Sequence, residues 1–118
     1  MDLTFAVEPD DTLVVTLRDG THETTVGVRP ANAGARSLGD ALARAILHGY
    51  GECFWPGSTG GQYWWAFKCD ADTLETMAMW TRGGASLWEH VFRATDSAEW
   101  VRSRLAAETE RVGLASHT

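Results

Sequence analysis

Cys53 is one of two cysteines in this 118-residue sequence, and two groups that can exchange protons lie close to it. His48 and Glu52 are five positions and one position away, so the three residues could supply a nucleophile and a base. Covalent catalysis of this kind also needs a third orienting group and an oxyanion site, and the sequence identifies neither. We therefore assign no catalytic residue, and we expect a protein that is not an enzyme.

A second candidate for chemistry is the pair Asp70 and Asp72, which follows an apolar run. The segment Phe67-Lys68-Cys69-Asp70-Ala71-Asp72-Thr73-Leu74 resembles the first motif of haloacid-dehalogenase-type phosphatases, in which one Asp is the nucleophile and the next but one is an acid. The sequence lacks the Gly that usually follows the second Asp, and too little chain follows to build the expected α/β domain. A hairpin turn is the simpler interpretation, because Asp favours turns.

Neither metal nor nucleic-acid binding is indicated by the charged residues. The histidines and cysteines show no spacing typical of metal ligands, so we expect no cofactor; they are His22, His48, His90, His117, Cys53 and Cys69. The formal charge of −6 disfavours a phosphate-binding surface, since affinity for nucleic acid depends on clustered Lys and Arg. We expect no nucleic-acid partner.

The sequence also gives an expectation for location. Residues 1–5 lack a basic region followed by an apolar run, so no secretory signal is predicted, and no stretch is long enough for a membrane span. Two cysteines do not make a disulfide scaffold, which indicates a cytoplasmic protein without membrane contact. Basic residues are almost all Arg, and Ala and Gly are abundant, a usage typical of GC-rich bacteria.

Six tryptophans within residues 55–100 are the most informative feature of the chain: Trp55, Trp64, Trp65, Trp80, Trp88 and Trp100. Indole is large and apolar, and its N–H needs a partner when buried. Such a concentration predicts either one heavily packed core or an aromatic recognition surface.

The elements that position these residues follow from hydrophobic periodicity. Residues 3–7, 12–17 and 22–28 alternate as strands, with Leu3, Phe5 and Val7 facing Leu17, Val15 and Leu13 across a short turn. Ser37 and Asp40 resemble a capping box that starts a helix, and Gly49 can end it with a left-handed cap.

The second half predicts a similar arrangement. Residues 62–69, 73–81 and 86–95 alternate as strands, and a helix follows, capped by Asp96 and Glu99. We expect one α+β domain of two antiparallel three-stranded meanders, each followed by a helix. Residues 1–50 form the first βββα half, residues 51–61 a Gly-rich loop, residues 62–113 the second βββα half, and residues 114–118 a frayed tail.

Alternation sorts the second meander into two faces, given a two-residue turn at Gly83-Gly84 that pairs Met79 with Trp88. The more uniformly apolar face holds Tyr63, Trp65, Phe67, Cys69, Leu74, Ala78, Trp80, Leu87 and Val91. The mixed face holds Trp64, Ala66, Lys68, Glu75, Met77, Met79, Trp88, His90 and Phe92. Two apolar faces require cover on both sides, by a helix, a second subunit, a ligand or a partner protein.

Met and Trp together are enriched at binding surfaces, which makes the mixed face and the neighbouring loop the predicted site. Its residues are Trp55, Trp64, Met77, Met79, Trp88 and His90. We expect a small acidic binding protein, an inhibitor or immunity-type partner of another protein. Two alternatives stay open: a small-molecule pocket between sheet and helix that uses His90, Glu75 or Glu89, and a homodimer whose interface is this face.

Overall fold

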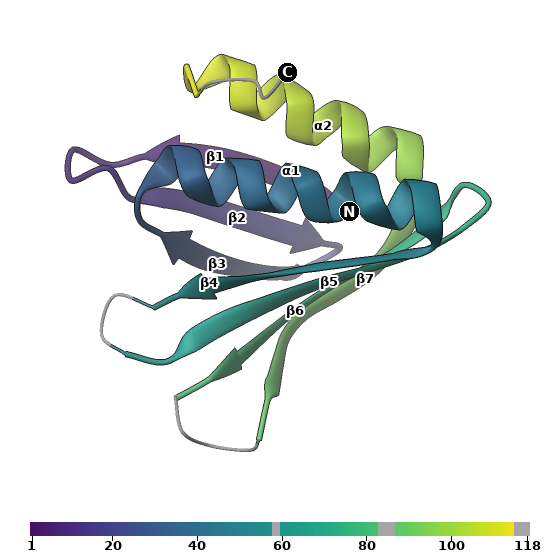
Figure 1. The fold of residues 1–118 in the computed structure, drawn as a ribbon, viewed down its shortest axis with the longest axis horizontal. Coiled ribbons are helices and arrows are strands. Elements are labelled where there is room, and N and C mark those ends of the chain that lie inside the picture. Colours follow the sequence, from purple (N-terminus) through teal and green to yellow (C-terminus); the bar gives the residue numbers. More distant parts are fainter. Residues whose placement is uncertain (58–59, 83–86, 115–118) are drawn as a thin grey trace.

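Seven strands in two antiparallel sheets and two helices make up the α+β domain (Figure 1). The computed structural model describes residues 1–57, 60–82 and 87–114. The three-stranded sheet consists of β1 (Asp2–Val7), β2 (Leu13–Asp19) and β3 (His22–Val28), and the four-stranded sheet of β4 (Tyr50–Pro56), β5 (Gln62–Asp70), β6 (Thr73–Thr81) and β7 (Glu89–Ser97). Helix α1 spans Ala31–His48 and helix α2 spans Ala98–Arg111.

The three-stranded sheet confirms the predicted register. Leu3 pairs with Leu17, Phe5 with Val15 and Val7 with Leu13. Alternation places one side chain in two on the inner face, where Phe5, Leu13, Val15 and Leu17 are almost fully buried. The helices close the core, since α1 packs on β2, β4 and β5, and α2 packs on β1 and β7.

Helix α1 begins six residues before the predicted capping box. Pro30 is its N-cap residue, and Ser37 lies inside the helix, where its hydroxyl donates to the Gly34 carbonyl. A Cβ on Gly34 would lie 2.2 Å from Val28 Cγ1, so the first turns pack directly on β3. Tertiary packing, not a capping side chain, therefore sets this start. The predicted end is confirmed, because Gly49 has φ +93° and its N–H donates to Ala45.

The predicted Gly-rich loop is wrong over most of its length, because residues 50–56 form strand β4 at the edge of the four-stranded sheet. Glycine at position 51 has a packing reason: an added Cβ would lie 1.9 Å from the Ala41 carbonyl oxygen of α1. The element order is thus βββα followed by ββββα, and the predicted βββα repeat is not the topology.

The pairing of β6 with β7 differs from the prediction by a register shift. Met79 pairs with His90, not with Trp88, and an irregularity lies between Ala78 and Met79. Across it, Ala78 pairs with Phe92, which leaves Val91 as the extra residue of a β-bulge. Phe92 therefore lies in the core, 2% exposed, and not on the mixed face. The predicted Gly83-Gly84 turn and most of the predicted tail lie outside the described residues.

Ser97 is the N-cap residue of helix α2, and its hydroxyl accepts a hydrogen bond from the Trp100 N–H, so Asp96 is not the cap. The buried Glu108 of α2 accepts a hydrogen bond from the Phe5 N–H of β1 and forms an ion pair with Arg111. A carboxylate at this position satisfies a strand N–H that the helix would otherwise cover. This contact fixes α2 on the edge of the three-stranded sheet.

Candidate functional site

A separate aromatic cluster covers the face of the four-stranded sheet that is turned away from α1. Phe54, Trp64 and Trp88 contact one another there, with ring centroids 5.4 to 6.2 Å apart. Trp64 and Trp88 pack over Ala66, Met77 and Met79, which form a small buried group distinct from the main core, and Phe54 joins them through its ring contacts. We call these six residues the outer-face cluster.

Strand register explains how the cluster forms. Phe54, Trp64 and Met79 lie in one row across β4, β5 and β6, and Ala66 and Met77 lie side by side in the next row. Side chains at alternate positions share a face, so the strands that bury the core on one side present these residues on the other. No residue of α1, α2 or the three-stranded sheet belongs to this cluster within the described chain.

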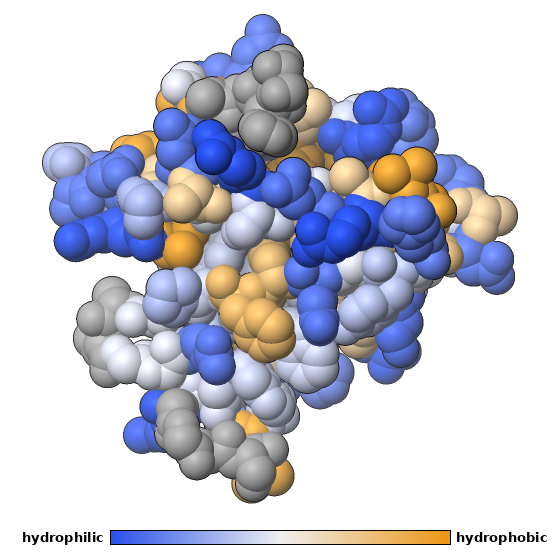
Figure 2. Space-filling model, in the orientation of Figure 1, coloured by the Kyte–Doolittle hydropathy of each residue, from blue (hydrophilic) through white to orange (hydrophobic). Residues whose placement is uncertain are grey.

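Aromatic rings cover the two methionines but remain accessible themselves. Met77 and Met79 are 9% and 7% exposed, whereas Phe54 is 48% exposed and Trp64 and Trp88 are half-buried. Figure 2 shows an apolar patch below α1, over the region of β4 and β5, framed by pale and blue side chains. The face is therefore an open aromatic surface and not a second closed core.

Glu52 provides a negative charge beside the cluster. Its Oε2 accepts hydrogen bonds from Trp64 Nε1 at 2.9 Å and from the Tyr50 hydroxyl at 2.8 Å. Burial, followed by the contact with this carboxylate, raises the pKa of Tyr50. Both bonds end on one oxygen, and among the described residues the other oxygen, Oε1, has no hydrogen-bond partner.

Four of the six predicted site residues come together as expected: Trp64, Met77, Met79 and Trp88. His90 lies next to them in the row of Met79 and is exposed. Trp55 does not join the site, because it is 1% exposed, packs edge-on against Trp65 and donates its N–H to Ser37. It points into the core because it belongs to a strand, where alternation turns Phe54 and Trp55 to opposite faces.

Phe54 and Tyr50 are the members of the site that the sequence prediction missed. Phe54 was hidden by the interpretation of residues 51–61 as a loop, and Tyr50 by its assignment to the end of the first βββα half, whereas both belong to β4. Alternation of Glu52 and Phe54 with Cys53 and Trp55 was the signal available, and the flanking glycines masked it.

The environment of Cys53 does not suit a nucleophile. Cys53 is 8% exposed on the inner face, and burial raises the pKa of its thiol to about 11, the opposite of what thiolate chemistry needs. Glu52 lies on the other face of β4, and His48 is exposed at the end of α1. The three residues therefore form no catalytic group.

The two-aspartate segment is a hairpin turn, as the simpler interpretation predicted. Asp70 pairs with Thr73, and Asp72 accepts hydrogen bonds from the Ser97 hydroxyl and the Glu99 N–H. These contacts hold the pKa of Asp72 below its usual value, with the Ser97 bond as the largest cause. Asp72 thus supports the start of α2.

Glu75, one of the polar groups named for the alternative pocket between sheet and helix, lies on the sheet face that is turned away from α1. It pairs with Arg93, its oxygen 2.6 Å from Nε. The predicted contact of Glu75 with Lys68 is present as a strand pairing, while the ion pair is made with Arg93. Residues 1–57, 60–82 and 87–114 contain no group of three His, Cys, Asp or Glu side chains placed to hold a metal ion.

Comparisons of the chain with protein-family models, curated proteins and solved structures found no match. Neither helix of the described chain has the length and apolar character needed to cross a membrane.

Proposed function

We propose that this chain is a protein-binding domain that docks a basic partner protein through the outer-face cluster. The observation that carries the proposal is the cluster itself: three contacting aromatic rings on a sheet face that no described helix covers. Large accessible aromatic groups beside Met are typical of the centre of protein interfaces. Rings already packed on one another also lose little side-chain freedom on binding.

The charge of the chain favours a basic partner. The formal charge is −6, which draws positively charged proteins into encounter. At the cluster, Glu52 Oε1 is available to a Lys or Arg of that partner, while Oε2 is held by Trp64 and Tyr50. An inhibitor or immunity protein acts in this manner, by covering a basic surface of another protein.

Phe54→Ser is the sharpest test, because this ring is half exposed and its loss should leave the fold intact. The control is Leu47→Ser, which removes a 75% exposed apolar side chain from α1, away from the cluster. The wild-type protein and both variants are immobilised and exposed to native lysate. The captured partner is then purified, and its affinity for each of the three proteins is measured by titration calorimetry. We expect one direct partner with a pI above neutrality, bound at least about tenfold more weakly by Phe54→Ser and unchanged by Leu47→Ser.

Three outcomes would overturn the proposal. One is a direct partner whose affinity is the same for Phe54→Ser and wild type. Another is concentration-dependent dimerisation, measured by light scattering, that Phe54→Ser abolishes, which would make the cluster a subunit interface. The third is the absence of any protein that binds directly once purified.

A further inference from the structure

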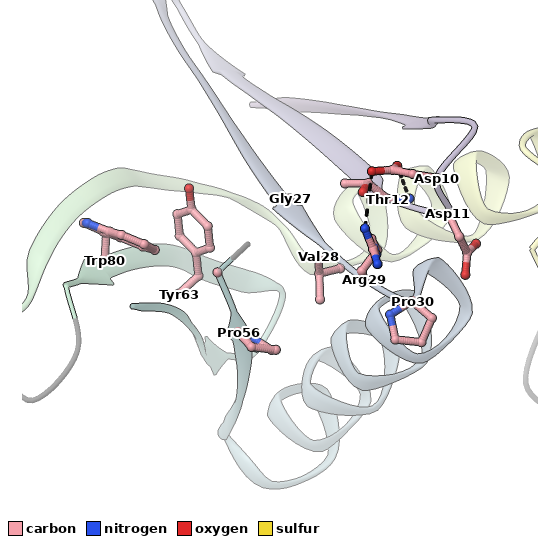
Figure 3. Close-up of a pocket in the computed structure, with 11 residues that line it drawn as sticks. Asp10, Asp11, Thr12, Gly27, Val28, Arg29, Pro30, Pro56, Tyr63 and Trp80 are labelled. Carbon is pink, nitrogen blue, oxygen red and sulfur yellow. Dashed lines mark hydrogen bonds and ion pairs between the residues drawn. The ribbon is translucent and has the colours of Figure 1, made fainter. Parts of the chain in front are cut away.

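A second aromatic surface lies in a cleft between the ends of the two sheets. The cleft has a volume of about 840 Å³, within the range of sites that hold small molecules. In Figure 3, Tyr63 and Trp80 stand on one side and Asp10, Thr12 and Arg29 on the other, with Val28 and Pro56 between them. The cleft therefore has an aromatic end, an apolar middle and a charged end.

The aromatic end is held in place by backbone. The Tyr63 and Trp80 rings contact at a centroid distance of 4.8 Å with an interplanar angle of 48°. A Cβ on Gly57 or Gly61 would lie 3.0 Å or 2.6 Å from Trp80 Cη2, so the indole packs directly on these two glycines. Alternation placed Trp80 on the more uniformly apolar face, and in the structure it is half-buried there because it lines the cleft.

Negative charge exceeds positive charge at the other end. Two carboxylates, those of Asp10 and Asp11, and a single guanidinium, that of Arg29, line this end, and Arg29 Nη1 lies 3.5 Å from Asp10 Oδ2. The contact of Asp10 with Thr12 is the largest cause that lowers the pKa of its carboxyl, so it is ionised at neutral pH. An anionic ligand would meet two carboxylates and one guanidinium that is already paired.

We propose that this cleft binds an organic cation, an ammonium or guanidinium group carried on an apolar stem. The cation binds at the charged end, where carboxylates outnumber guanidinium groups, and the stem covers Val28 and Pro56 and packs towards the rings of Tyr63 and Trp80. A free amine and the Lys or Arg side chain of a peptide share this chemistry. The proposal does not depend on the outer-face cluster.

Three probes test the proposal; they share a phenylethyl stem and differ in the terminal polar group: 2-phenylethylammonium, 2-phenylethanol and 3-phenylpropanoate. Binding is followed by ¹H–¹⁵N NMR of the full chain, with the indole signal of Trp80 as reporter. We expect saturable binding of the cation at least about tenfold tighter than of the alcohol, and no binding of the anion. Equal affinity for the three probes, or shifts that lie away from the cleft, would overturn the proposal.

Variants separate binding from damage to the fold. Trp80→Leu should weaken binding of the cationic probe about tenfold, because it removes the ring against which the apolar stem packs. Trp100→Leu, at an exposed indole on α2, should leave binding unchanged. Arg29→Gln should tighten binding, because it removes the competing cation beside Asp10, and a misfolded variant could not show such a gain. Unchanged or weaker binding by Arg29→Gln would contradict the electrostatic argument.

Two further experiments identify the source of the bound cation and test whether the cleft and the outer-face cluster are independent sites. An acetylated, amidated Gly-Lys-Gly peptide that binds more tightly than the amine indicates a peptide side chain, and the reverse indicates a free amine. Phe54→Ser should bind the cation as wild type does, so failure at the cleft leaves the outer-face proposal standing. Loss of cation binding in Phe54→Ser would show that the cleft is not an independent site.

Discussion

Glu108→Gln should destabilise the fold in a manner that depends on pH. The Glu108 carboxylate accepts hydrogen bonds from the Phe5 N–H at 2.9 Å and from Arg111 at 2.8 and 3.0 Å. These contacts outweigh the effect of burial and lower its pKa from 4.5 to about 2, with the Arg111 bond as the largest cause. The carboxylate is therefore more acidic in the folded chain than in the unfolded chain.

The size of the effect follows from proton linkage. A difference of about 2.5 pKa units corresponds to about 3 kcal/mol of folding free energy. Arg111 is 56% exposed and solvent screens the pair, so we expect a loss of about 2 kcal/mol in Glu108→Gln at pH 7. The folded pKa is lowered, so this stabilisation is complete above pH 4.5 and disappears as the pH falls towards 2.

Urea unfolding followed by tryptophan fluorescence at pH 7, 5, 4 and 3 measures the effect. The matched control is Glu99→Gln, which removes an exposed ion pair with Arg102 on the same helix and should change stability little. The gap between wild type and Glu108→Gln should narrow between pH 5 and pH 3. A gap that stays constant, or is no larger than that of Glu99→Gln, would refute the role assigned to this carboxylate.

Two further predictions concern β4. Gly51→Ala should lower the free energy of unfolding in urea by about 3 kcal/mol or more, because the added Cβ would meet the Ala41 carbonyl oxygen. The control Gly39→Ala, in open space on α1, should raise the free energy of unfolding by up to about 1 kcal/mol. A mild effect at position 51 would mean that α1 and β4 are not in close contact. In native protein Cys69 should react with Ellman's reagent well before Cys53, whose raised pKa reduces its thiolate about a hundredfold; equal rates would place Cys53 at the surface.

The three-stranded sheet could be predicted in register because its inward positions are uniformly apolar and its turns are short. Strand β4 could not, for a reason that lies outside the strand. Position 51 must be glycine because α1 passes directly over it, and that requirement gives the segment a loop-like composition. A tertiary contact thus removed the local signal that would have marked an edge strand.

The candidate site was partly predictable for a related reason. Alternation along β5 and β6 assigned Trp64, Met77 and Met79 to one face, and they share it. The same rule failed on β7, because the extra residue Val91 reverses the facing of every residue beyond it and sends Phe92 into the core. Hydrophobic periodicity alone gives no sign of a β-bulge. The assignment of side chains to sheet faces is therefore valid only up to the first bulge in the strand.

Three consecutive aromatic residues of β5 illustrate how much depends on this register. Tyr63 lines the cleft, Trp64 lies in the outer-face cluster and Trp65 is 1% exposed in the core. A shift of one residue would turn Trp64 inward and bring Tyr63 and Trp65 to the outer face, so it would disrupt the core and both proposed sites at once. On β4, close contact of Gly51 with α1 opposes a shift of the same kind, because the neighbours of Gly51 carry side chains that this space does not admit. The glycine that hid the strand from the sequence is thus the residue that keeps Phe54 on the outer face and Trp55 in the core.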